Sequence, residues 1–174
     1  PVGKDSLSMA TRWQQDERPC EVIAPLSLVV TAFAPVSDIH TTWTPVLRTN
    51  VESVLVFIDL ASGRCRLGGS ALAQVYGQVG SEVPDVESAA AIRHFFAATR
   101  ELMQRGQVLS YHDRSDGGLF VTLAEMAFAG RCGIEVDLGE GDPLAVLFNE
   151  ELGAVLQIEK SKLNSALQVL KNHR

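Results

Sequence analysis

The eight residues from 112 to 119, HDRSDGGL, carry the side chains of this sequence that are best placed to do chemistry. Two aspartates and a serine precede two glycines, between an apolar run and a run with helical spacing. We expect a strand to end at His112 and a helix to begin near Gly118. Phosphates commonly bind where strand ends and helix N-termini converge in layered α/β domains. The stretch therefore predicts an anion-binding turn.

The two aspartates of this turn have different expected roles. Asp116 lies just before the glycines, so we expect it to cap the helix by accepting a hydrogen bond from a first-turn N–H. Asp113 has no such role, and its carboxylate suits Mg²⁺, which completes its shell with phosphate oxygens and water. Ser115 can donate to a phosphate or to the backbone. A plain capped turn with a solvated Asp113 is the alternative, because Asp, Ser and Gly are ordinary turn residues.

Two other polar groups are weaker candidates. GKDS at residues 3–6 lacks the spacer and first glycine of a Walker A sequence, yet Lys4 and Ser6 beside free backbone N–H groups can hold an anion. In FNEELG, the side chains of Asn149, Glu150 and Glu151 either support a binding site or solvate a loop. The four histidines show no helical pairing, and no nucleophile has a base beside it in the sequence, so we expect no catalytic residue here.

Composition narrows the classes of function. The chain has 174 residues, is 46% hydrophobic and carries a net charge of -6 with no basic run, so it can bury a core and is a poor partner for nucleic acid. No apolar run approaches a membrane span. Three cysteines without CxxC spacing suit reduced thiols and a cytoplasmic location. The opening residues PVGKDSLSM read as the interior of a longer protein.

Strand and helix patterns alternate along the chain. The sequence predicts a polar linker over residues 11–20 and strands over 26–33, 51–60, 107–112, 133–138 and 153–159. Helices are predicted from residue 70, over 84–105, 117–130, 143–151 and 160–172, with the second opened by Pro84 and Asp85. In the helix over 117–130 the expected buried residues are Leu119, Phe120, Leu123, Ala124, Ala127 and Phe128. Strands interleaved with helices indicate an α/β or α+β layered domain.

Several strings in this sequence, taken together, resemble one enzyme family. They are PVGKDSLSM, APVSDIHTTWTPVLRT, GGSALAQVYGQVG, YHDRSDGGLFVTLAEMAFAG and LFNEELGAVLQIE. They look like consecutive blocks of the large, multidomain form of phosphoribosylformylglycinamidine synthase, and the resemblance spans essentially the whole chain. It implies that residues 1–20 are the tail of a preceding synthetase domain and a linker. Residues 21–174 would be a C-terminal-type domain of the aminoimidazole ribonucleotide synthetase-like core, a layered α/β/α fold.

The resemblance also implies a reaction and its partners. The family is a ligase of de novo purine biosynthesis that converts formylglycinamide ribonucleotide to formylglycinamidine ribonucleotide, using ATP and ammonia released from glutamine. ATP activates the formyl amide oxygen, and ammonia displaces phosphate. The remaining synthetase domains and the glutaminase domain of the same chain would be partners, and they would hold the catalytic groups. This chain alone would be inactive.

Residue by residue, the resemblance assigns Asp113 to Mg²⁺ and Ser115 to the nucleotide, at the site where ADP is held in a structural role. Gly3 and Ser6 match a turn that touches nucleotide and substrate phosphate. Lys4 departs from the short form of the family, which has a metal-binding Asn there, so Lys4 is expected to be a phosphate counter-ion. The alternative from another class is a packing module whose ligand residues have no role of their own.

Overall fold

The computed structural model describes residues 10–23, 31–36 and 38–173. The chain divides into two compact units, residues 1–39 and 40–174. No helix of the described residues is both long enough and apolar enough to cross a lipid bilayer. The strand expected over 26–33 falls largely outside the described residues, and residues 31–36 have no regular secondary structure.

A β-hairpin lies in the first unit where the sequence predicted a linker. It consists of β1 (Ala10–Gln15) and β2 (Arg18–Ile23), paired antiparallel. Gln15 pairs with Arg18, so Asp16 and Glu17 form a two-residue turn, both with positive φ (49° and 61°). No side chain of this hairpin is fully buried. A strand with two exposed faces does not need alternating apolar and polar residues, which is the pattern by which a strand is recognised in a sequence. The lack of regular secondary structure expected over residues 11–20 was therefore wrong.

The second unit is built on a three-stranded antiparallel sheet. Its strands are β3 (Ser53–Asp59), β4 (Val108–Asp113) and β5 (Gly153–Glu159), in the order β3-β5-β4. The central strand β5 pairs with both neighbours, and its residues from Ala154 to Ile158 are all buried. These three strands confirm the predictions over 51–60, 107–112 and 153–159.

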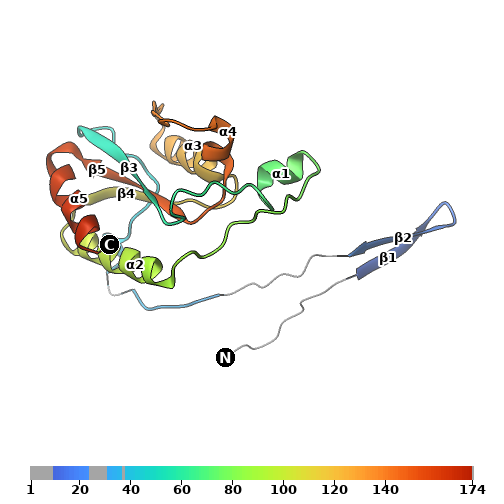
Figure 1. Ribbon diagram of the computed structural model, residues 1–174. Coiled ribbons are helices and arrows are strands. Elements are labelled where there is room, and N and C mark those ends of the chain that lie inside the picture. Colours follow the sequence, from blue (N-terminus) through green and yellow to red (C-terminus); the bar gives the residue numbers. More distant parts are fainter. Residues whose placement is uncertain (1–9, 24–30, 37, 174) are drawn as a thin grey trace. The chain divides into compact units, whose positions relative to one another are not determined.

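Helices cover both faces of this sheet (Figure 1). On one face, α2 (Ala89–Gln104) and α5 (Leu163–Asn172) pack against Leu156 and Ile158 of β5, which are fully buried. On the other face, α3 (Gly118–Gly130) packs against Val155. Because strand side chains alternate between faces, β5 supplies both cores, at about 1.5–3 kcal/mol for each large apolar side chain. The predicted layered α/β/α fold is confirmed.

Shorter helices connect these layers. They are α1 (Ala71–Val75), α4 (Pro143–Phe148) and the 3-10 turns η1 (Ile39–Thr41) and η2 (Lys160–Lys162). Helix α1 begins where the Ser70 hydroxyl accepts from the Ala73 N–H, and α4 begins where Asp142 accepts from the Leu144 N–H. Both are side-chain caps of the usual kind.

Helix α2 begins later than the sequence predicted. Pro84 and Asp85 do not open it, because the Asp85 carboxylate accepts from the adjacent Val86 N–H at 2.7 Å. The helix starts instead at Ala89, where the Ser88 hydroxyl accepts from Ala91 N at 3.2 Å. A local side-chain bond at Asp85 has taken the place of a helical cap.

Two further predictions differ from the structure. Residues 133–138 do not form a strand and pair with no other strand of the described residues. Their apolar side chains Ile134 and Leu138 instead pack against the core on the α3 side of the sheet. In α3, Phe120 is 50% exposed and Phe128 is 77% exposed, although both were expected to be buried. The stripe that faces the sheet includes Leu119, Thr122, Leu123 and Met126.

Candidate functional site

The turn between β4 and α3 is held in place by its own backbone. Arg114 N donates to Gly153 O at 2.8 Å, and Gly118 N donates to Ser115 O at 2.9 Å. Gly117 and Gly118 have φ of 80° and 68°, a region that glycine occupies without strain. A Cβ on Gly118 would lie 2.6 Å from the carbonyl oxygens of two residues of the 147–149 segment. The double glycine is therefore required by both conformation and space.

Arg114 anchors the turn to the sheet from below. Its side chain is buried, and its guanidinium donates to the Leu152 carbonyl at 3.0 Å, to the Glu151 carbonyl and to the Asp59 carboxylate at 3.1 Å. It also lies 4.9 Å from the ring centroid of Phe57. Burial lowers the pKa of Arg114, because removal from water disfavours the charge, while Asp59 acts in the opposite sense. An arginine in this setting remains a cation.

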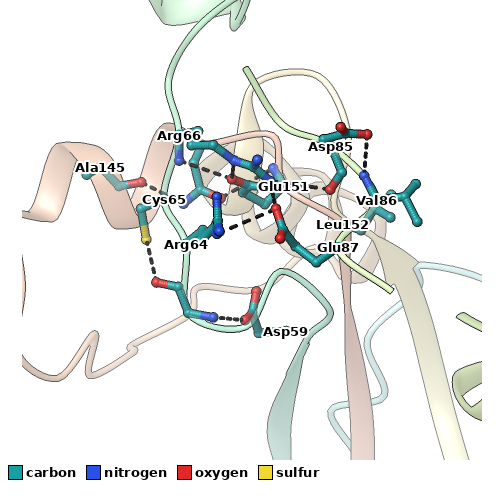
Figure 2. A network of polar contacts seen from close by, with 12 residues as sticks. Asp59, Arg64, Cys65, Arg66, Asp85, Val86, Glu87, Ala145, Glu151 and Leu152 are labelled. Atoms are coloured by element: carbon teal, nitrogen blue, oxygen red, sulfur yellow. Dashed lines mark hydrogen bonds and ion pairs between the residues drawn. The ribbon is translucent and has the colours of Figure 1, made fainter. Parts of the chain in front are cut away.

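Glu151, whose carbonyl accepts from Arg114, forms a second buried ion pair with Arg66 (Figure 2). The Glu151 side chain has no exposed surface, and its Oε2 accepts from Arg66 Nη2 at 2.8 Å, while Oε1 accepts from Arg66 N at 3.2 Å. Arg66 also pairs with Glu87 at 2.9 Å. The hydrogen bond from Arg66 lowers the pKa of Glu151 and keeps this buried carboxylate ionised.

Asn149 closes α4 next to this pair. It is 1% exposed, and its amide donates to Ala145 O at 2.6 Å and to Val146 O at 3.1 Å, while its oxygen accepts from Glu151 N at 3.3 Å. The FNEELG segment therefore does not solvate a loop. Its first and third polar residues support the turn from inside the domain.

Glu150, between these two residues, binds two helix ends. One of its oxygens, Oε1, accepts from Ala71 N at 2.8 Å and from Gly117 N at 2.7 Å. Gly117 is the N-cap of α3, and no side chain of its own caps this helix. The prediction that Asp116 caps α3 was wrong, because the glycine pair turns the backbone and a carboxylate distant in sequence takes the N–H.

The polar side chains of the turn point away from this supporting frame. Asp113 is 67% exposed, and Ser115 and Asp116 are exposed. Within the part of the chain that the structure describes, the side chains of Ser115 and Asp116 make no hydrogen bond. The backbone of the turn is thus fixed while these side chains stay available to a ligand.

His112 lies between two oxygen acceptors beside Asp113. Its Nδ1 is 2.8 Å from the Asp113 carbonyl and 3.7 Å from the Asp113 Oδ1, and its Nε2 is 2.6 Å from Glu125 Oε2. Over the described residues, no group of three or more His, Cys, Asp or Glu is arranged to hold a metal ion. A single exposed carboxylate such as that of Asp113 is a donor that Mg²⁺ can share with phosphate oxygens and water.

The sequence-predicted site residues are only partly brought together by the structure. Asp113 and Ser115 lie on the same turn, as expected. Gly3, Lys4 and Ser6 lie outside the described residues. Arg114, Arg66 and Asp59 were not among the predicted candidates, since no local pattern distinguishes a buried arginine from a surface one.

Two family models match the chain. The AIR synthase related protein, C-terminal domain, matches residues 51–174, and the FGAR-AT PurM_N-like domain matches residues 1–35. These matches confirm the resemblance that the sequence blocks indicated.

Solved structures from Thermotoga maritima share the fold. One is described as the structure of PurLQS, with a TM-score of 0.61 and 20% identity over 78% of this chain and 22% of that chain. T. maritima PurL complexed with FGAR has a TM-score of 0.61 and 19% identity over 78% of this chain and 24% of that chain. T. maritima PurL complexed with ATP has a TM-score of 0.54 and 17% identity over 78% and 22%. This chain thus spans about a quarter or less of the length of the structures it matches.

Proposed function

This chain belongs to the family of AIR synthase related proteins through their C-terminal domain, and on that premise we propose that it forms part of a nucleotide site in an ATP-dependent phosphoribosylformylglycinamidine synthase. The similar structures complexed with ATP, AMPPCP, ADP and FGAR support this proposal at the level of a shared fold. The complete enzyme would form formylglycinamidine ribonucleotide in purine biosynthesis, with glutamine as the source of ammonia.

One observation carries the proposal: the rigid turn between β4 and α3 presents Asp113 and Ser115 as exposed side chains. Arg114 and the glycine pair fix the backbone of this turn when the domain folds. The conformational entropy of the turn is therefore lost during folding and does not weaken ligand binding.

The proposed roles follow from the chemistry of these groups. The Asp113 carboxylate would hold Mg²⁺, which neutralises phosphate charge when bound, and the Ser115 hydroxyl would donate to a phosphate oxygen. We assign both to the site that retains ADP in a structural role. Gly3 would contact the nucleotide, and Lys4 and Ser6 the substrate phosphate. No residue of this chain is assigned a catalytic step.

The organisation of the larger protein is also part of the proposal. Residues 1–20 would end a preceding synthetase domain and linker, and residues 21–174 would form the C-terminal-type domain. Other synthetase domains and a glutaminase domain of the same chain would be its partners, in the cytoplasm.

A second candidate function is a packing module, and exposed aromatic residues favour it. Phe96 on α2 is 61% exposed and Phe128 on α3 is 77% exposed. Under this alternative, the domain would contact other domains through these faces while Asp113 and Ser115 bind nothing.

Nucleotide content of the purified complete synthetase separates the two functions. Asp113→Asn removes the metal-binding charge and should lower the ADP retained per protein by about tenfold, since losing one charge-assisted contact to a ligand costs on the order of 1.4 kcal/mol. Ser115→Ala should lower it by less. Asp116→Asn, in the same turn, is the matched control and should retain ADP as the wild type does. Unchanged ADP content in Asp113→Asn would favour the packing module.

A further inference from the structure

Glu150 joins the two helices that begin near the candidate site. The same carboxylate oxygen accepts from the first N–H of α1, at Ala71, and from the N–H of Gly117 at the start of α3. The side chain is half-buried. Over the described residues, its other oxygen, Oε2, accepts no hydrogen bond.

This arrangement places a fixed negative charge at the helix end where an anion would otherwise bind. The first N–H groups of a helix are free donors, and the helix dipole makes them favourable for phosphate. Here Glu150 already occupies the Gly117 N–H and neutralises part of that dipole. Arg114, a few residues earlier, cannot neutralise the charge of a phosphate, because its guanidinium is buried against Asp59 and two carbonyls.

We propose that Glu150 is a positioning residue that makes polyphosphate binding at this turn depend on a divalent cation. The inference rests on the proposed nucleotide site. The carboxylate prevents a phosphate from docking directly on the start of α3, so the phosphate binds through the cation held by Asp113, with the Ser115 hydroxyl as a further donor. Nucleotide without the cation is thereby excluded.

The same carboxylate oxygen also bonds the start of α1 to the start of α3. Helix α1 has only five residues, and its N-cap Ser70 is fully buried with its hydroxyl donating to Leu67 O at 2.6 Å. Glu150 lies 79 residues after Ala71 and 33 residues after Gly117, and it accepts from both. Geometry and charge are therefore two separable contributions of one side chain.

Substitutions of Glu150 in the complete synthetase separate them. Glu150→Gln keeps an oxygen that can accept both N–H groups but removes the charge. Glu150→Asp keeps the charge on a shorter side chain. Calorimetry of the enzyme freed of its retained ADP gives the affinity for ATP with Mg²⁺ and with a chelator, and the ratio of the two affinities is the quantity compared. Glu140→Gln, an exposed carboxylate in the loop before α4, is the control.

We expect Glu150→Gln to lower this ratio about fivefold, the size of a charge effect at a helix end, mainly by raising the affinity for metal-free ATP. Glu150→Asp and Glu140→Gln should keep the wild-type ratio. If the glutamine variant does not fold, Glu150→Ala also lacks the charge, and its ratio must fall as well.

The outcomes distinguish this inference from the proposed function. An unchanged ratio in the charge-removing variant that folds, with ATP binding still sensitive to Asp113→Asn, overturns the role of Glu150 alone. If ATP binding is the same in wild type, Asp113→Asn and Ser115→Ala, the nucleotide site itself is overturned, and the inference with it.

Discussion

Arg114 is the side chain whose removal should most disturb the candidate site without touching its exposed groups. Replacement by methionine keeps much of the apolar stem and removes the guanidinium. Three acceptors then lose a donor: the carbonyls of Glu151 and Leu152 and the carboxylate of Asp59. The Leu152 carbonyl keeps its bond from Leu60 N at 3.0 Å. Asp59 keeps only its bond from Gly63 N at 2.7 Å among its described contacts.

The expected loss in the free energy of unfolding follows from the burial of the Arg114–Asp59 ion pair. The Arg114 side chain is 3% exposed and that of Asp59 is 28% exposed, so the pair is largely removed from solvent. Removing one partner of such a pair destabilises a protein by about 3–5 kcal/mol, which is a large part of the total stability of a domain. For a chain of this length, the melting temperature should fall by about 10 °C.

Urea unfolding followed by circular dichroism measures this loss, from the midpoint and slope of the transition. Arg114→Lys keeps one charge but cannot reach all three acceptors, and should lose less than the methionine variant. Arg93→Met, on the exposed face of α2, is the matched control and should stay within about 0.5 kcal/mol of the wild type. A decrease in the free energy of unfolding of less than about 1 kcal/mol for Arg114→Met would refute the claim that buried Arg114 stabilises the turn.

Two further predictions concern the same frame. The pKa of Glu151 is lowered by its hydrogen bond from Arg66, so the pair contributes its full stability above the ordinary pKa of 4.5 and loses it as pH falls through the lowered value. Urea midpoints measured between neutral pH and about pH 3 should therefore fall less steeply in Glu151→Gln than in the wild type, and equal slopes would contradict the pairing. Gly118→Ala should lower the free energy of unfolding by more than about 2 kcal/mol, because its Cβ would meet two carbonyl oxygens at 2.6 Å. Gly133→Ala has open space around it and should change stability little; similar losses for the two variants would contradict the steric argument.

The layered fold was predictable because its core follows regular patterns. The apolar runs that became β3, β4 and β5 are bounded by turn residues, and the long α2 pattern repeats at three and four residues. Such periodicity reports burial on one face, which is what positions strands and helices. The start of α2 was missed by a few residues because Asp85 bonds its own neighbour, a choice that sequence spacing does not decide.

The exposed ligand candidates were easier to predict than the residues that support them. Asp113 and Ser115 were chosen as candidates from the local chemistry of a turn and from the family resemblance. Arg114 stands between them in sequence, yet its role depends on Asp59, which is 55 residues away. Likewise, Glu150 rather than Asp116 bonds the start of α3, because tertiary contact brings a distant carboxylate to a site that local capping preferences would give to a neighbour.

Binding of Mn²⁺ with ATP to the complete synthetase, followed by electron paramagnetic resonance, tests the central claim most directly. Mn²⁺ takes the same oxygen ligands as Mg²⁺ and reports its bound fraction. The account predicts a bound Mn²⁺ population that Asp113→Asn removes and Asp116→Asn leaves intact. An equal bound fraction in wild type, Asp113→Asn and Asp116→Asn would contradict it.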